Sequence, residues 1–165
     1  MSFGLGHGKP LEPGASGLSQ RDLPAPELGR LGPAYFFAHR PLAPFELEIG
    51  SGKGTFLMQQ APTQPETNFL GIEYAGEFYR YAADRIRRAG LPNARMLYAD
   101  AVEFVHHWLA DGCCRTVHLY FSDPWPKSRH HKRRVVQDST LLEFHRVLEP
   151  GGELRLVTDH GLHLV

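Results

Sequence analysis

Short apolar runs alternate with longer segments of helical periodicity from residue 45 onward. Five runs have the length and composition of strands: 45–49, 68–72, 94–98, 116–121 and 153–158. The intervening segments place apolar residues at helical spacing and predict helices over about 54–60, 77–88 and 139–147, with another after Asp100. Such alternation is typical of a parallel sheet with helices on both faces. We therefore expect a doubly wound α/β fold, with its site at the carboxyl ends of the strands.

Residues 1–33 show neither the apolar period of a helix nor that of a strand. They contain seven glycines and five prolines, a composition that does not offset the entropy lost when a chain is ordered. We expect a flexible arm over residues 1–33, followed by one domain over residues 34–165. A length of 165 residues suits a single domain.

Composition narrows the class of protein. Eighteen Lys and Arg balance eighteen Asp and Glu, so affinity for nucleic acid has to come from a local cluster. No apolar run approaches the roughly 20 residues of a membrane-spanning helix, and the first residues lack the pattern of a signal peptide. We expect a cytoplasmic protein without membrane contact. The adjacent pair Cys113 and Cys114 and the scattered histidines lack ligand spacing, so no metal site is expected.

Acidic residues recur where the predicted strands end. A single carboxylate at such a place is more often a helix cap. Its recurrence at all five strands instead indicates one functional edge of the sheet. The residues concerned are Glu48, Glu73, Asp100, Asp123 and Asp159.

The first of these strand ends leads into a glycine-rich turn, Glu48-Ile-Gly-Ser-Gly-Lys-Gly54. It departs from the G-x-G-x-x-G/A pattern of dinucleotide-binding proteins, because Thr55 stands where a small residue is needed. An acidic residue before G-x-G-x-G resembles the first motif of Rossmann-like methyltransferases. Glu73 follows the glycines at about the spacing of a ribose-binding carboxylate. Asp100 fits two interpretations equally well, a helix cap or a contact to an adenine amino group.

The most specific segment is Phe121-Ser-Asp-Pro-Trp-Pro-Lys127, which leads into a basic run ending at Arg134. Two prolines stiffen the loop and fix the directions of Asp123 and Trp125. A rigid carboxylate beside an aromatic ring suits a flipped base, and the basic run suits the phosphates around it. Trp125 either stacks on a base or packs the loop. A basic run alone is more often a solvated surface, but this one adjoins a carboxylate at a strand end.

These segments together resemble the tRNA (guanine-N7-)-methyltransferases of the bacterial single-chain type. The resemblance is carried by residues 47–54, 69–73, 100–101, 121–127 with 132–134, and 158–159. It implies a Rossmann-like class I fold and S-adenosyl-L-methionine as the cofactor. It also implies methyl transfer to N7 of a guanine in the variable loop of tRNA, position 46, which forms 7-methylguanosine. The implied partner is tRNA, with no obligatory protein partner.

The resemblance also assigns roles to single residues. Asp123 matches the catalytic position of the family, and Lys127 and Asp159 match positions that contact tRNA. We add Trp125 and the triplet Lys132, Arg133 and Arg134 as tRNA-binding candidates on their chemistry. The positions implied to bind the cofactor are Glu48, Gly50, Gly52, Gly54, Glu73, Asp100, Ala101 and Asp123.

The sequence departs from the family pattern after Asp159, where only six residues follow. Members of the family continue with a helix, the last strands of the sheet and a Thr-x-x-Glu element. The sheet is therefore expected to lack its last strands and to leave residues 153–158 as an open edge. Either the chain is a fragment or a partner covers that edge. Two alternatives follow, an inactive tRNA-binding chain or a methyltransferase for another substrate.

Overall fold

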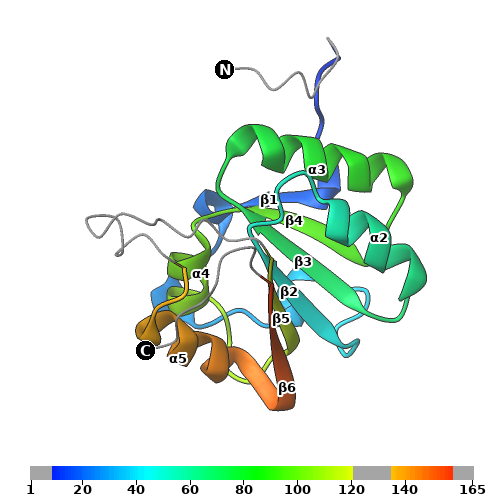
Figure 1. Cartoon of the computed structure of the whole chain (residues 1–165). Coiled ribbons are helices and arrows are strands. Elements are labelled where there is room, and N and C mark those ends of the chain that lie inside the picture. Colours follow the sequence, from blue (N-terminus) through cyan, green and yellow to red (C-terminus); the bar gives the residue numbers. More distant parts are fainter. Residues whose placement is uncertain (1–8, 121–134, 158–165) are drawn as a thin grey trace.

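A six-stranded sheet, parallel throughout, forms the centre of the molecule (Figure 1). The computed structural model describes residues 9–120 and 135–157. The strand order is β1-β4-β3-β2-β5-β6. All five expected strands are present, and the α/β fold is confirmed. Their bounds are β2 Phe45–Ile49, β3 Asn68–Glu73, β4 Ala94–Tyr98, β5 Cys114–Tyr120 and β6 Leu148–Val157.

Helices cover both faces of this sheet. On one face, α2 (Thr55–Thr63) and α3 (Gly76–Ala89) bury apolar side chains against β3 and β4. On the other face, α4 (Ala101–His107) and α5 (Asp138–Val147) pack with the short α1 (Pro33–Phe36) over the larger core cluster. None of the helices in the described part of the chain is long and apolar enough to cross a membrane.

The second helix runs past the end that the sequence indicates. A stop before Pro62 was expected, but α2 continues to Thr63. Proline lacks the N–H that would bond to the carbonyl four residues back. Because Pro62 lies in the last turn, α2 loses that bond only at its end.

Residues 9–33 are not the flexible arm that their composition suggests. They form a short strand, β1 (Gly17–Ser19), which pairs with β4 at the edge of the sheet. Three turns of 3-10 helix flank it, at Gly14–Ser16, Gln20–Asp22 and Pro26–Leu28. The expectation of a flexible arm is therefore wrong for residues 9–33, and residues 1–8 lie outside the described residues.

Contacts with distant parts of the chain hold this segment. The indole N–H of Trp108 donates to the Pro24 carbonyl at 2.9 Å, and Leu31 N–H donates to the Trp108 carbonyl at 2.6 Å. Arg87 donates to the Glu12 carbonyl at 2.8 Å. Such contacts leave no local pattern, which is why glycine and proline content alone misjudges the segment.

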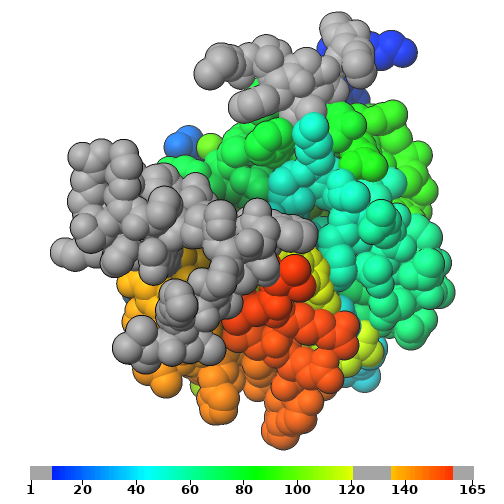
Figure 2. Space-filling model, in the orientation of Figure 1, coloured from blue at the N-terminus to red at the C-terminus, as the bar shows by residue number. Residues whose placement is uncertain are grey.

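The other edge of the described sheet is β6. Among residues 9–120 and 135–157, its only neighbouring strand is β5. Leu156 and Val157 are more than a third exposed, and Figure 2 shows β6 in orange and red at the molecular surface. This arrangement agrees with the expected open edge for these residues.

Candidate functional site at the carboxyl edge of the sheet

The carboxyl ends of β2, β3 and β4 meet at one edge of the parallel sheet. Glu48 lies in β2, Glu73 ends β3, and Asp100 follows β4 as the N-cap of α4. In-register pairing of β2 with β3, and of β3 with β4, brings these three positions to the same edge. The structure therefore places three of the five expected acidic residues where parallel α/β folds bind ligands.

The glycine-rich turn after β2 has a conformation that favours glycine. Gly50, Gly52 and Gly54 have φ angles of 70°, 55° and 74°. Side chains with a Cβ rarely adopt these angles. A Cβ added at Gly54 would also lie 2.8 Å from the Ala82 Cβ, whereas at Gly50 and Gly52 it would meet open space. The turn thus exposes backbone to a ligand at its first two glycines and packs against α3 at the third.

Glu73 holds this turn in place. Its Oε2 accepts a hydrogen bond from Gly52 N–H at 2.7 Å, and its Oε1 accepts one from Ala75 N–H at 2.9 Å. Each carboxylate oxygen has a further lone pair, so the side chain can still accept from hydroxyl groups. The N-cap of α3 is Ala75, which has no side-chain cap. Glu73 thus binds backbone amides without acting as the N-cap residue of α3.

Glu48 is a buried carboxyl group with an unsatisfied oxygen. The residue is only 6% exposed, and its Oε2 has no hydrogen-bond partner. Burial raises the pKa of this carboxyl, the Ser51 hydroxyl lowers it and the charge of Glu73 raises it, and the net pKa is about 7. A buried polar group without a partner costs folding energy. The position therefore fits a cationic hydrogen-bond donor, such as an ammonium group, that would supply the missing partner.

Asp100 combines the two interpretations that the sequence left open. Its Oδ1 accepts from Glu103 N–H at 3.0 Å and so caps α4, whose first residue is Ala101. The side chain remains exposed, and its second oxygen can accept from a ligand. The cap and the ligand contact are thus compatible in one residue.

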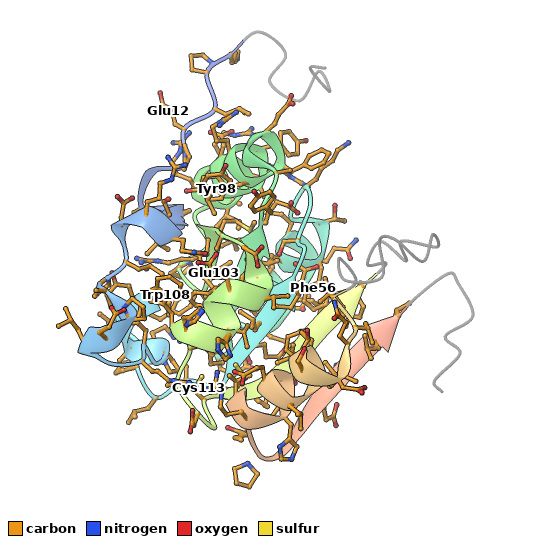
Figure 3. The ribbon with its side chains drawn as sticks, turned by 90° about the vertical axis from the view of Figure 1, so that its left-hand side faces the viewer. Glu12, Phe56, Tyr98, Glu103, Trp108 and Cys113 are labelled. Atoms are coloured by element: carbon orange, nitrogen blue, oxygen red, sulfur yellow. The ribbon has the colours of Figure 1, made fainter. Side chains whose placement is uncertain are left out.

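A cavity of about 420 Å³ lies beside Asp100, between α4 and the N-terminal segment (Figure 3). Its size is within the range of small-molecule sites. Tyr74 and Tyr98 contribute aromatic rings, and Gln20, whose Oε1 is buried without a partner, contributes a polar wall. No local pattern in residues 19–25 indicates this contribution, because it arises from the pairing of β1 with β4.

The remaining expected site residues lie outside the described residues. They are Asp123, Trp125, Lys127, Lys132, Arg133, Arg134 and Asp159. The described part of the site consists of the glycine turn and the three carboxylates. Within residues 9–120 and 135–157, no three His, Cys, Asp or Glu side chains gather as a metal site.

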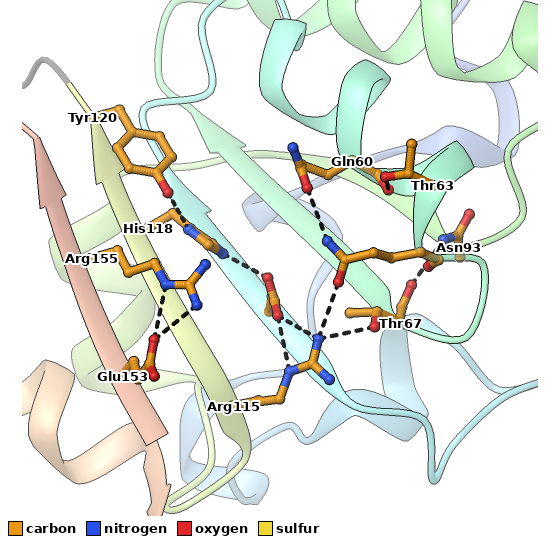
Figure 4. A network of polar contacts seen from close by, with 11 residues as sticks. Gln60, Thr63, Thr67, Asn93, Arg115, His118, Tyr120, Glu153 and Arg155 are labelled. Carbon is orange, nitrogen blue, oxygen red and sulfur yellow. Dashed lines mark hydrogen bonds and ion pairs between the residues drawn. The ribbon is translucent and has the colours of Figure 1, made fainter. Parts of the chain in front are cut away.

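A polar cluster that the sequence patterns do not indicate lies directly below the carboxyl edge of the sheet (Figure 4). Glu46 of β2 contacts His118 of β5 at 2.6 Å, and His118 contacts the Tyr120 hydroxyl at 2.6 Å. Arg115 donates to the other oxygen of Glu46 at 3.0 and 2.6 Å. The only signal in the sequence was the presence of polar residues inside two otherwise apolar strands.

Known proteins resemble this chain both in sequence and in fold. The chain is 44% identical over 117 residues to a tRNA (guanine-N(7)-)-methyltransferase of Alkalilimnicola ehrlichii, covering 71% of this chain and 49% of that protein. A protein of the same name from Rhodopirellula baltica is 41% identical over 121 residues, covering 70% and 45%. The crystal structure of the antibiotic-resistance methyltransferase Kmr superposes with a TM-score of 0.54 at 28% identity, covering 72% and 64%.

The chain spans about half the length of the curated relatives that it matches. A family model described as "Putative methyltransferase" matches residues 42–164, which include the glycine turn and all the strand-end carboxylates. The resemblance that the motifs indicated is thereby confirmed at the level of the family. The chain belongs to this family of methyltransferases.

Proposed function

We propose that the protein transfers a methyl group from S-adenosyl-L-methionine to N7 of guanine 46 in the variable loop of tRNA, forming 7-methylguanosine. The observation that carries this proposal is the convergence of Glu48, Glu73 and Asp100 on one edge of the sheet, where β5 also ends, three residues before Asp123 in the sequence. The names of the two relatives reported above, both tRNA (guanine-N(7)-)-methyltransferases, support the same reaction.

The described edge offers partners for three polar parts of this cofactor. The amino group would donate a hydrogen bond to the unpartnered oxygen of Glu48, and the ribose hydroxyls would donate to Glu73. The exposed oxygen of Asp100 suits the adenine amino group, beside Ala101 at the start of α4. Gly50 and Gly52 leave room for close approach to the backbone. No phosphate is needed, which agrees with a turn that departs from the dinucleotide-binding pattern.

Methyl transfer to guanine N7 depends on the positioning of the two reactants more than on proton transfer. The bound cofactor supplies a methyl group on a sulfonium centre. Guanine N7 has a lone pair and no proton, so attack on the methyl carbon requires no general base. As the N7–C bond forms, the S–C bond breaks and its electron pair stays on sulfur, leaving a cationic guanine. The chain therefore contributes mainly by aligning the two reactants.

Asp123 is the proposed catalytic residue. Its carboxylate can accept from the N1–H and N2–H edge of guanine and stabilise the positive charge that develops on the ring. Trp125, Lys127 and Asp159 are proposed to contact tRNA around that base. Lys132, Arg133 and Arg134 are proposed to attract phosphates, an interaction that weakens with salt.

The test is methyl transfer from methyl-labelled S-adenosyl-L-methionine to an unmodified tRNA transcript, with Asp123→Asn as the variant. We expect the wild type to label guanine and Asp123→Asn to lose roughly a hundredfold in rate, because an amide cannot offset the developing charge. Thermal unfolding of the same variant, followed by circular dichroism, checks its fold, and rates are compared at saturating cofactor because Asp123 is also a candidate cofactor-binding position. Wild-type turnover in Asp123→Asn would contradict the catalytic assignment. Labelling of protein or a small molecule in place of tRNA would contradict the substrate.

A further inference from the structure

The polar cluster below the edge forms a continuous chain of contacts that runs towards the ligand side of the sheet. Glu46 Oε2 lies 2.6 Å from His118 Nε2, and His118 Nδ1 lies 2.6 Å from Tyr120 Oη. The Glu46 and His118 side chains are 7% and 2% exposed. Figure 4 shows the chain leading along β5 to Tyr120, the last residue of that strand.

The charges in this cluster fix which atoms donate. Burial raises the pKa of Glu46, but hydrogen bonds from His118 and Arg115 and their charges lower it overall, so the group is a carboxylate and only accepts. His118 Nε2 must therefore carry a proton and donate to Glu46. Arg115 already balances the charge of Glu46.

In the tautomer of His118 that carries its proton on Nε2, Nδ1 is an acceptor. In that tautomer the Tyr120 hydroxyl is the donor in the 2.6 Å contact. Its proton points inward, to the imidazole, and its oxygen keeps lone pairs for a donor on the outer side. Burial raises the pKa of Tyr120, Arg155 lowers it, and the carboxylates of Glu48 and Glu46 raise it. The net effect is a raised pKa, which keeps the phenol protonated in this role.

Tyr120 and Glu48 lie on the neighbouring strands β5 and β2, close enough for the charge of Glu48 to affect Tyr120. In the pairing of β2 with β5, Glu48 is opposite His118 and Ile49 is opposite Leu119, so Tyr120 is level with the start of the glycine turn. Side chains alternate between the faces of a strand, which puts Tyr120, His118 and Glu48 on the same face. The Phe56 ring of α2 lies 4.6 Å from the His118 ring and 5.2 Å from the Tyr120 ring and restricts both.

The edge thus presents two oxygens that can accept from a ligand, the unpartnered Glu48 Oε2 and the Tyr120 phenol oxygen. A small cation with several N–H groups would satisfy both. We propose that Tyr120 and Glu48 together bind the α-amino group of S-adenosylmethionine, and that Glu46 and His118 act as positioning residues by orienting the Tyr120 hydroxyl. This inference rests on the proposed function, since it assumes that cofactor.

Two ligands separate this role from a general effect on the site. S-adenosylhomocysteine contains the amino group, whereas 5′-methylthioadenosine has the same adenosine and sulfur without the amino acid portion. We would measure the dissociation constants of both by calorimetry on the full chain, for the wild type, Tyr120→Phe and His118→Asn. Tyr120→Phe removes one oxygen and keeps the ring, so the fold should be retained.

We expect Tyr120→Phe to weaken binding of S-adenosylhomocysteine about tenfold, the loss of roughly one hydrogen bond to a charged group. Its affinity for 5′-methylthioadenosine should stay within about twofold of the wild-type value. His118→Asn should show a smaller loss of the same selectivity, about threefold, because the hydroxyl remains but is no longer oriented.

Unchanged binding of S-adenosylhomocysteine by Tyr120→Phe would overturn the inference and leave the proposed function standing. Equal weakening of both ligands would also overturn it, because the residue would then act on adenosine or on the fold. Failure of the wild type to bind either ligand would instead refute the proposed cofactor, and the inference with it.

Discussion

At the scale of single residues, the most unusual side chain is that of Glu48, an ionisable group in a buried position. Its carboxyl lies in a strand whose five residues are all buried, with one oxygen unpartnered. Folding therefore favours the protonated acid, and burial raises its pKa to about 7. We interpret the unfavourable burial of this carboxyl as a feature of a binding site, in which a cationic ligand would stabilise the ionised form.

The same shift predicts how stability depends on pH. The ordinary pKa of a glutamate side chain is 4.5, and that of Glu48 in the folded protein is about 7, so between these values the native state binds more protons than the unfolded state. The free energy of unfolding should fall as pH rises from 5 to 8. Relative to Glu48→Gln, which cannot titrate, we expect the wild type to lose about 3 kcal/mol over this range.

Urea unfolding of both proteins at several pH values between 5 and 8 measures this difference. Glu48→Gln is the matched control because it keeps the shape of the side chain and removes only the titration. Parallel stability curves for the two proteins would show that the carboxyl is not destabilised by burial and would contradict the interpretation.

Part of the site could be predicted from single residues. Glu48, Glu73 and Asp100 each end a predicted strand, and parallel pairing brings such ends together whatever the details of packing. Glu46 and His118 could not be found in this way, because they lie inside strands and are 72 residues apart in sequence. Only the register of β2 against β5 makes them neighbours.

At the scale of elements, β1 is the strand that no sequence pattern predicts. Buried parallel strands are recognisable as apolar runs, whereas β1 is the three-residue segment Gly-Leu-Ser. Gly17 allows a close approach that no local pattern reports: a Cβ there would lie 2.5 Å from the Tyr79 hydroxyl and from the Pro13 Cβ. The pairing with β4 places residues 19–25 against the cavity beside Asp100.

Gly17→Val should therefore displace β1 from the sheet. We expect faster hydrogen exchange of the amides of residues 17–25 and a loss of about 2 kcal/mol in the free energy of unfolding, typical of overpacking. Exchange in β2 and β5 should change little. Gly32→Ala is the control, since no atom lies within 4 Å of a Cβ at Gly32. Wild-type protection of residues 17–25 in Gly17→Val would contradict the close packing of β1.

At the scale of the whole molecule, the described residues divide the proposed site into two halves. The half proposed for the cofactor is built from β2, β3, β4 and the glycine turn. The residues proposed to hold guanine and tRNA lie outside the described residues, and the chain spans about half the length of the curated relatives it matches. The family follows from the sequence as a whole, whereas the substrate depends on the segment around Asp123.

The measurement that tests the central claim most directly is a map of methylated positions in a tRNA transcript after incubation with the protein and S-adenosyl-L-methionine. Chain cleavage at 7-methylguanosine, read at single-nucleotide resolution, identifies each modified guanine. The proposed function predicts one cleavage, at guanine 46 in the variable loop, which is absent without the cofactor. Methylation at another nucleotide, or a transcript without any 7-methylguanosine although the protein binds S-adenosylhomocysteine, would contradict it.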